Sequence, residues 1–148
     1  MFCALMNMSD CIFCKIIKGE LPSSNVYEDE SVIAFLDHSP VNPGHALVVS
    51  KEHHPDLVST PPQVISKLIE AAQTIAPAVL AATDSQGFNL NLNNGSAAGQ
   101  VVNHIHFHIV PRHPNDGLKL WPGQPYQAGE IEELADKIRN NISIIRIN

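Results

Sequence analysis

The chain has 148 residues, nine of them Lys or Arg and fifteen Asp or Glu, which gives a formal net charge of −6. This length fits one domain that buries about two-thirds of its unfolded surface. The scattered cations exclude a basic surface for nucleic acid, so small molecules or proteins are the expected partners. No apolar run reaches the roughly eighteen residues of a membrane span, and the N-terminus lacks the features of a signal peptide. The protein is therefore predicted to be cytoplasmic and not bound to a membrane.

The predicted single domain covers residues 9–148 and follows a flexible leader, residues 1–8. Residues 11–19 have the pattern of a short helix, with Asp10 as a candidate cap and Gly19 at its end.

Two cysteines, Cys11 and Cys14, lie three residues apart in this helix. In a reducing compartment, such a pair indicates metal or redox chemistry more readily than a disulfide. The spacing suits half of a zinc site, whose other ligands must come from elsewhere in the chain.

Three strands are expected next, at residues 26–28, 32–36 and 46–49, and their short connections favour antiparallel pairing. A capping-box pattern at 60–63 then opens one long amphipathic helix, in which Pro77 predicts a kink.

The second half of the chain contains two further strands and a helix. Residues 88–93 alternate between apolar residues and asparagine, as a strand does. The small-residue loop at 94–100 suits backbone contacts to a phosphate and equally suits an ordinary hairpin connection. Residues 130–138 form an amphipathic C-terminal helix with acidic residues at its start.

The most informative segment is 103–112, where histidine alternates with apolar residues. In a strand, His104, His106 and His108 share one face, with neighbouring Cα atoms about 6.8 Å apart and the outer two about 13.5 Å apart. Because zinc holds nitrogen ligands at about 2.1 Å, the three cannot easily converge on one ion. The row therefore favours an acid–base and nucleophile array. The alternative is a solvated edge with incidental histidines.

These residues resemble the signature of the histidine triad (HIT) nucleotide hydrolases and transferases, here His104-Ile105-His106-Phe107-His108-Ile109-Val110. The resemblance extends over most of the chain, is closest to a bacterial branch related to the purine nucleoside phosphoramidases, and includes the segments 11–17, 35–37, 43–48, 93–95 and 99–100. It implies an α+β fold with a five-stranded antiparallel sheet, one long central helix and short N- and C-terminal helices. It also implies a homodimer whose sheets are continuous.

The resemblance implies cleavage of purine nucleoside phosphoramidates, or related nucleotidyl esters, at the α-phosphate. His106 would be the nucleophile that forms a nucleotidyl-histidine intermediate, with His108 and His45 assisting charge and proton transfer. Phosphate and ribose contacts are implied for Asn93, for the backbone near Gly99 and Gln100, and for Asp37. The apolar base pocket would comprise Ile12, Phe13, Ile16 and Phe35, for each of which simple core packing is at least as good an interpretation.

Some members of this branch bind structural zinc, and the matching positions here are Cys11, Cys14, His53 and His104. Because His54 adjoins His53, the match could shift by one residue, and a solvated histidine pair is the alternative. No catalytic metal is expected. Val101 departs from the serine of eukaryotic relatives, which puts the leaving-group preference in doubt.

Three other functions compete with this one. They are dinucleoside polyphosphate hydrolysis, a nucleotide- or partner-binding module with little turnover, and metal-dependent hydrolysis.

Overall fold

The computed structural model describes residues 10–147, so the leader predicted at residues 1–8 lies outside the described residues. The chain divides into two compact units, Met1–Asp116 and Gly117–Asn148, which are described one at a time. The single domain predicted over residues 9–148 stays a prediction.

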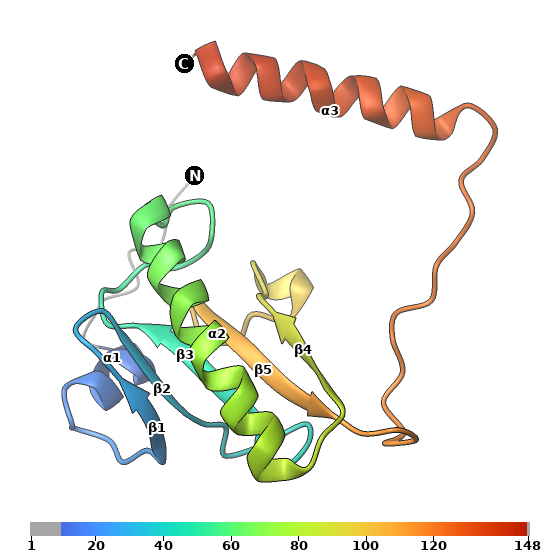
Figure 1. The fold of residues 1–148 in the computed structure, drawn as a ribbon. Coiled ribbons are helices and arrows are strands. Elements are labelled where there is room, and N and C mark those ends of the chain that lie inside the picture. Colours follow the sequence, from blue (N-terminus) through green and yellow to red (C-terminus); the bar gives the residue numbers. More distant parts are fainter. Residues whose placement is uncertain (1–9, 148) are drawn as a thin grey trace. The chain divides into compact units, whose positions relative to one another are not determined.

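The first unit is built on one five-stranded antiparallel sheet (Figure 1). Its spatial order is β1-β2-β3-β5-β4, which places β5 beside β3 and leaves β1 and β4 at the edges. This arrangement confirms the predicted α+β fold. The strands are β1 (Asn25–Glu28), β2 (Val32–Leu36), β3 (Ala46–Ser50), β4 (Gly87–Asn91) and β5 (His106–Arg112).

One face of the sheet is covered by α2 (Pro62–Thr83), whose apolar stripe forms the main core. The helix continues through Pro77. By length and composition α2 resembles a membrane span, contrary to the expectation from the sequence. The burial of one of its faces against the sheet accounts for that composition, because a core helix has the same apolar content. The buried α2 residues are Leu68, Ala71, Ala72, Ile75, Ala76 and Val79.

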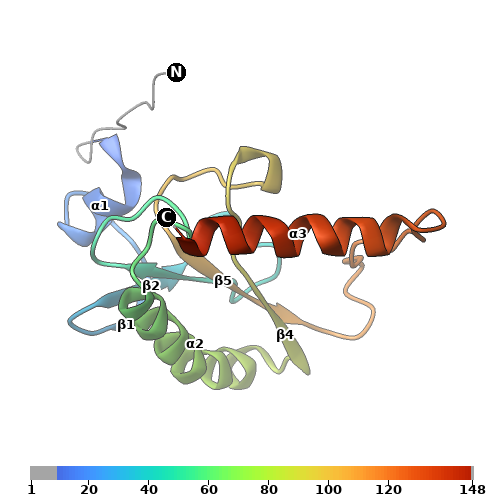
Figure 2. The same cartoon turned by 90° about the horizontal axis from the view of Figure 1, so that it is seen from above.

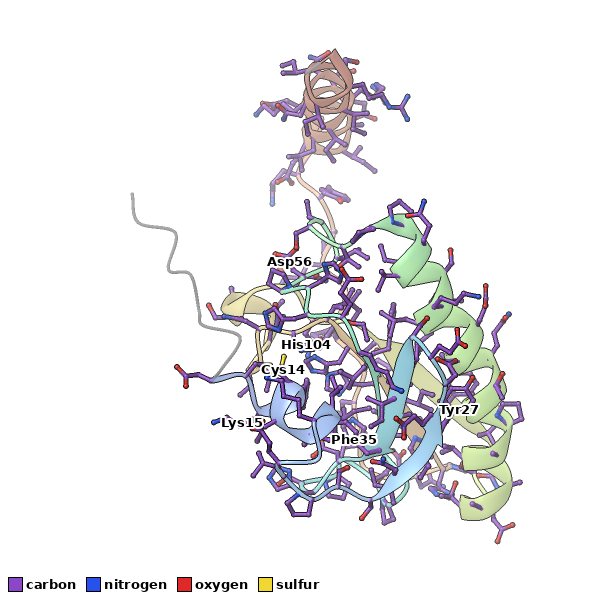
Figure 3. The ribbon with its side chains drawn as sticks, turned by 90° about the vertical axis from the view of Figure 1, so that its left-hand side faces the viewer. Cys14, Lys15, Tyr27, Phe35, Asp56 and His104 are labelled. Carbon is purple, nitrogen blue, oxygen red and sulfur yellow. The ribbon has the colours of Figure 1, made fainter. Side chains whose placement is uncertain are left out.

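The opposite face of the sheet carries the short helix α1 (Ile12–Ile17) (Figure 3). A second core cluster lies here, in which Phe13 and Cys14 of α1 pack with Phe35 of β2 and with β3. Because side chains alternate along β5, Phe107 faces α2 and His106 faces α1. His106 is therefore buried beneath α1, whereas His108 is half-buried.

Two predicted helix caps are wrong. The N-cap of α1 is Cys11 rather than Asp10, and no side chain caps it. The N-cap of α2 is Pro61, because the Thr60 hydroxyl donates to the carbonyl of Asp56 and is not available to the helix.

The second unit contains one uninterrupted helix, α3 (Glu130–Ile147), which is visible in Figures 1 and 2. Its 18 residues make it twice as long as the predicted segment 130–138, so the expectation of a short C-terminal helix is wrong. The apolar repeat continues beyond Ile138 at Ile142 and Ile145, and neither glycine nor proline interrupts it.

Candidate active site and metal-binding cluster

Three imidazoles gather where β5 runs beside β3. His106 pairs with Val49 and His108 with Leu47 across the two strands, while His45 immediately precedes β3. The ring centroids of His106 and His108 lie 4.8 Å apart, and those of His45 and His108 lie 5.2 Å apart. Two members of the predicted row, His106 and His108, thus lie side by side, and the third ring beside them is His45 rather than His104. His104 lies before β5 rather than within it, so the predicted segment 103–112 begins three residues too early.

The backbone fixes the tautomer of His106. Its Nδ1 lies 2.6 Å from the carbonyl oxygen of His104, and since a carbonyl only accepts, Nδ1 carries the hydrogen. Burial lowers the pKa of His106, although the His104 bond and the charge of Asp37 oppose that effect. Near neutral pH the ring is therefore uncharged, with the lone pair of Nε2 available as a nucleophile.

A second chain of hydrogen bonds orders His45 and His108. The amide of Val41 donates to Nδ1 of His45 at 3.2 Å, so the remaining hydrogen of a neutral His45 lies on Nε2. This nitrogen lies 2.9 Å from Nδ1 of His108, which must then accept. The hydrogen of His108 is thereby assigned to Nε2, a buried atom with no hydrogen-bond partner among the described residues. The Nε2–H group of His108 is therefore a donor whose orientation depends on His45 and on the Val41 amide.

Burial also has the largest effect on the pKa values of His45 and His108. It lowers the pKa of His45, and the carboxylate of Asp37 opposes that effect. Burial, followed by the nearby His106 and His45, lowers the pKa of His108 to about 4. The side chains of Asp37, His45 and His108 have ligand atoms within 4.8 Å of one another, so they could hold a metal ion. In this structure the rings of His45 and His108 form a hydrogen bond with each other.

A separate cluster joins α1, the segment after β3 and the residue two positions before β5. The ligand atoms of Cys11, Cys14, His53 and His104 all lie within 4.8 Å of one another. The sulfur of Cys14 is 3.3 Å from Nδ1 of His53 and 3.6 Å from Nδ1 of His104, and the two Nδ1 atoms are 3.2 Å apart. Four ligands around zinc at 2.0–2.3 Å would have edges of about 3.6 Å, close to these separations.

The protonation of His104 also suits a metal. Its Nε2 lies 2.7 Å from the carbonyl oxygen of Ser50 and therefore donates, so the lone pair of Nδ1 faces the cysteines. Burial, with the neighbouring Cys11, raises the pKa of Cys14 to about 11, so a metal would have to displace its proton. His53, not His54, belongs to this cluster, and its role as a metal ligand stays a prediction.

The loop between β4 and β5 brings together the residues expected to bind phosphate. The side-chain amide of Asn93 donates to the carbonyl of Gly99 at 3.5 Å, and Gly99 has a positive φ of 84°. The backbone N–H groups of Gly99 and Gln100 donate to Ser96 and Gly95 within the same turn. Phosphate contacts by these amides stay a prediction.

The side chain of Gln100 serves the fold of this loop. Its oxygen accepts from the amide of Gly95 at 2.8 Å, and its nitrogen donates to the carbonyl oxygens of Pro55 and Val102. By contrast, Val101 is 92% exposed.

The four residues predicted to form the base pocket differ in burial. Phe13 and Phe35 are buried with their ring centroids 5.6 Å apart, and Phe13 also packs edge-on to His106 at 5.0 Å. Ile16 packs against the same cluster, whereas Ile12 is 44% exposed. Phe13 therefore supports the His106 ring directly, and a base-binding role for the four stays a prediction.

Two contributors were missed by the sequence interpretation. The carbonyl of Ser50 orients His104, and the amide of Val41 orients His45. Both act through backbone atoms, which every residue type supplies, so no side-chain pattern indicates them.

The α+β fold therefore places three imidazoles, those of His45, His106 and His108, on the same sheet as a separate cluster of two cysteines and two histidines. The HIT domain model matches residues 18–115, and the chain belongs to the HIT family. One relative, the Arabidopsis thaliana protein named adenylylsulfatase HINT3, is 46% identical over 110 residues, or 74% of this chain and 56% of that protein. Another, the adenosine 5′-monophosphoramidase of Schizosaccharomyces pombe, is 36% identical over 135 residues, covering 89% of this chain and 98% of its own length.

Solved structures agree with the fold. A Streptococcus mutans protein matches with a TM-score of 0.86 at 40% identity, covering 91% of this chain and 87% of its own. A zinc-bound histidine triad family protein from Mycobacterium smegmatis matches with a TM-score of 0.72 at 38% identity, covering 79% and 85%.

Proposed function

We propose that the chain is a nucleotidyl hydrolase that cleaves purine nucleoside phosphoramidates, or related nucleotidyl esters, at the α-phosphate. The observation that supports this most directly is the tautomer of His106, whose Nδ1 donates to the His104 carbonyl and leaves Nε2 as a buried, uncharged nucleophile. The phosphoramidase and adenylylsulfatase names of the two relatives agree in naming an adenosine-phosphate group.

The reaction then has two displacements. In the first, Nε2 of His106 forms a bond to the α-phosphorus as the P–N bond of the substrate breaks. The departing amine takes a proton from Nε2 of His108, whose ring lies 2.9 Å from Nε2 of His45. His108 carries a second proton in the substrate complex, so this transfer leaves it as the neutral imidazole. In the second, water gives a proton back to His108 and attacks phosphorus, which releases the nucleoside monophosphate and restores His106.

Binding of the substrate is assigned to the residues around these rings. Asn93 and the backbone near Gly99 and Gln100 would hold the phosphate oxygens, and Asp37 would accept from the ribose hydroxyls. Asp37 supports this role by its place beside His45, with its Oδ2 atom 3.8 Å from Nδ1 of that ring. The base would lie against the apolar residues of α1 and β2, namely Ile12, Phe13, Ile16 and Phe35.

The Cys2His2 cluster is proposed to hold structural zinc. Its four ligand positions are all taken by protein atoms, so zinc there would have no open site for substrate, and its contribution would be to fix α1 and His104. The zinc-bound Mycobacterium smegmatis relative supports the choice of metal.

A cytoplasmic homodimer is proposed for the assembled protein. The edge strand β4 pairs only with β5 among the described strands, and it carries Phe88 and Leu90, which are 41% and 40% exposed. A second copy joined along this edge would cover them and extend the sheet. A monomer mass in light scattering would refute the dimer.

The mechanism is tested by intact mass spectrometry of protein quenched without acid during turnover of an adenosine phosphoramidate. Wild-type protein should gain one adenylyl group, and His106→Ala should gain none and lose turnover while keeping its circular-dichroism spectrum. Turnover by a folded His106→Ala variant would refute the nucleophile. A folded wild type that bound adenosine monophosphate without turning over the phosphoramidate would instead favour the nucleotide-binding alternative.

A further inference from the structure

His45 is the last residue of a tight turn that leads into β3. The backbone amide of His45 donates to the carbonyl of Asn42 at 3.0 Å, and Gly44 has a positive φ of 93°. With Pro43 before this glycine, the turn has the sequence and conformation of type II. The residue before the turn, Val41, donates its amide hydrogen to Nδ1 of the His45 ring at 3.2 Å. The ring is therefore oriented by the backbone at the start of its own turn.

The side chain of Asn42 connects this turn to the end of β5. Its amide nitrogen donates to the carbonyl of Pro111 at 2.9 Å and to Oδ2 of Asp116 at 3.1 Å. The two acceptors lie 69 and 74 residues further along the chain. Because an amide nitrogen carries two hydrogens, both donors of the Asn42 side chain can be satisfied in this position. The turn is thereby held at one place against the distant strand.

The carboxylate of Asp116 is a fixed acceptor. This side chain is only 7% exposed, and Arg112 binds both of its oxygens, with Nε 2.7 Å from Oδ2 and Nη2 3.0 Å from Oδ1. Such a two-pronged contact sets the plane of a carboxylate as well as its distance. Arg112 belongs to β5, the strand that also carries His108. Asn42 therefore ties the turn of one proposed catalytic histidine to the strand of another.

The Val41 amide has a competitor at the same ring nitrogen. Oδ2 of Asp37 lies 3.8 Å from Nδ1 of His45, and a carboxylate favours a hydrogen on the nitrogen that it approaches. An amide N–H favours a lone pair there instead. Because the two distances are similar, a small displacement of the turn would change which partner prevails. The position of the turn therefore decides where the hydrogen of the His45 ring lies.

We propose that Asn42 is a positioning residue for the reaction, which keeps the Val41 amide on Nδ1 of His45. Through the hydrogen bond between the His45 and His108 rings, it also orients the donor that serves the leaving group. The part of this role that concerns catalysis rests on the proposed hydrolase function, whereas the effect on the His45 ring does not. The ion pair of Arg112 and Asp116 thereby supports the site from the end of β5.

The first test is a long-range proton–nitrogen NMR spectrum of the histidine rings in protein without nucleotide, at neutral pH. Wild type should carry the hydrogen of His45 on Nε2. Asn42→Ala should shift part of it to Nδ1, toward Asp37. The ring of His106, which is held by the His104 carbonyl, should not change and so reports a retained fold. An unchanged His45 ring in the folded variant would overturn the proposal.

Two further variants sharpen this test. Asn89→Ala is the matched control, because the Asn89 oxygen accepts from Nη1 of Arg112 at 2.7 Å and joins this network to β4 rather than to the turn. It should leave the His45 ring unchanged. Asn42→Ser has one hydroxyl hydrogen, which cannot serve both acceptors, so it should shift the His45 hydrogen less than Asn42→Ala does. It replaces Asn42→Ala if that variant does not fold.

The second test compares two leaving groups on one nucleotide. An adenosine phosphoramidate releases an amine, which needs a proton, whereas the p-nitrophenyl ester of adenosine monophosphate releases a stable phenolate, which does not. Asn42→Ala should lower kcat for the amine about tenfold and kcat for the ester less than about twofold, with little change in KM. Asn89→Ala should lower neither.

The outcomes separate positioning from a general effect on the fold. Equal losses for the two leaving groups in Asn42→Ala would overturn the catalytic role, because a distorted site would slow both reactions. A wild type that turned over neither substrate would refute the hydrolase function and with it that role. The NMR spectrum would then still decide whether Asn42 orients the ring of His45.

Discussion

The protonation of His108 should depend on the phosphate of a bound nucleotide. In the empty site, burial and the neighbouring His106 and His45 lower the pKa of His108 to about 4, so the ring is neutral at pH 7. A neutral imidazole is a weak acid toward a departing amine, whereas an imidazolium is a strong one. We therefore expect the substrate itself to help charge the ring that protonates its leaving group.

The magnitude follows from the pKa of His108 and from a separation of about 4 Å between ring and phosphate, which the proposed proton transfer requires. Charging a ring with a pKa of about 4 at pH 7 costs about 4 kcal/mol, because each pH unit is worth about 1.4 kcal/mol. A phosphate charge about 4 Å from the ring, at an effective dielectric constant of about 20, contributes about 4 kcal/mol of attraction. The two quantities nearly cancel, so a bound monophosphate should raise the pKa of His108 to near 7.

The assay is an NMR titration of the His108 ring in protein alone, with adenosine and with adenosine monophosphate. Adenosine is the matched control, since it lacks only the phosphate. Protein alone and the adenosine complex should titrate near pH 4, and the monophosphate complex about three pH units higher. Equal pKa values for the two ligands would refute the electrostatic argument, and a pKa near 6.5 in the empty protein would refute the effect of burial.

Four further predictions concern the fold around the site. Gly44→Ala should destabilise the protein by about 1–3 kcal/mol in urea, because the added Cβ would meet Thr83 at 2.5 Å with φ at +93°, whereas Gly87→Ala meets nothing. Cys14→Ser should abolish stoichiometric zinc in plasma emission measurements and lower the melting temperature. Val41→Pro removes the backbone hydrogen bond to Nδ1 of His45, worth about 1 kcal/mol, and should slow release of amine leaving groups about fivefold, whereas Val41→Ala keeps this bond and should not. Below pH 6.5 the unfolded chain takes up a proton that folded His108 binds only near pH 4, so stability should fall by about 1.4 kcal/mol per pH unit, and less steeply in His108→Gln.

The fold was readable because its signals are local. Period-two alternation indicated β5 and the helical repeat indicated α2, because the apolar residues of the two elements pack in one core. Alternation also indicated β4, although its Phe88 and Leu90 are 41% and 40% exposed. The predictions were wrong where a residue fits a local sequence pattern but makes a different contact in the folded chain. Thr60 has the form of a helix cap, yet its hydroxyl bonds to the carbonyl of Asp56. His104 continues the alternation of β5, but its ring is held by the cysteine cluster and by Ser50, so the strand begins after it.

The site was readable only in part, because its geometry depends on distant segments. Spacing alone gave half of the metal cluster, and the assignment of His53 came from a family resemblance rather than from any local pattern. The tautomers of His45 and His106 depend on the backbone of Val41 and His104, and these contacts exist only once β3 and β5 lie side by side. Which side chains lie together was therefore partly predictable, whereas the ring nitrogen that carries the hydrogen was not.

His104 belongs to the Cys2His2 cluster and also contacts the proposed nucleophile, His106. Its ring is held on one side by the Ser50 carbonyl and faces Cys11 and Cys14 on the other, while its own carbonyl accepts the hydrogen of His106. Loss of the cluster would free the ring and, with it, the peptide that fixes the His106 tautomer. A metal that does not contact substrate would then affect the rate, because it would change the fraction of His106 whose lone pair is on Nε2. Its removal should therefore lower kcat more than it raises KM.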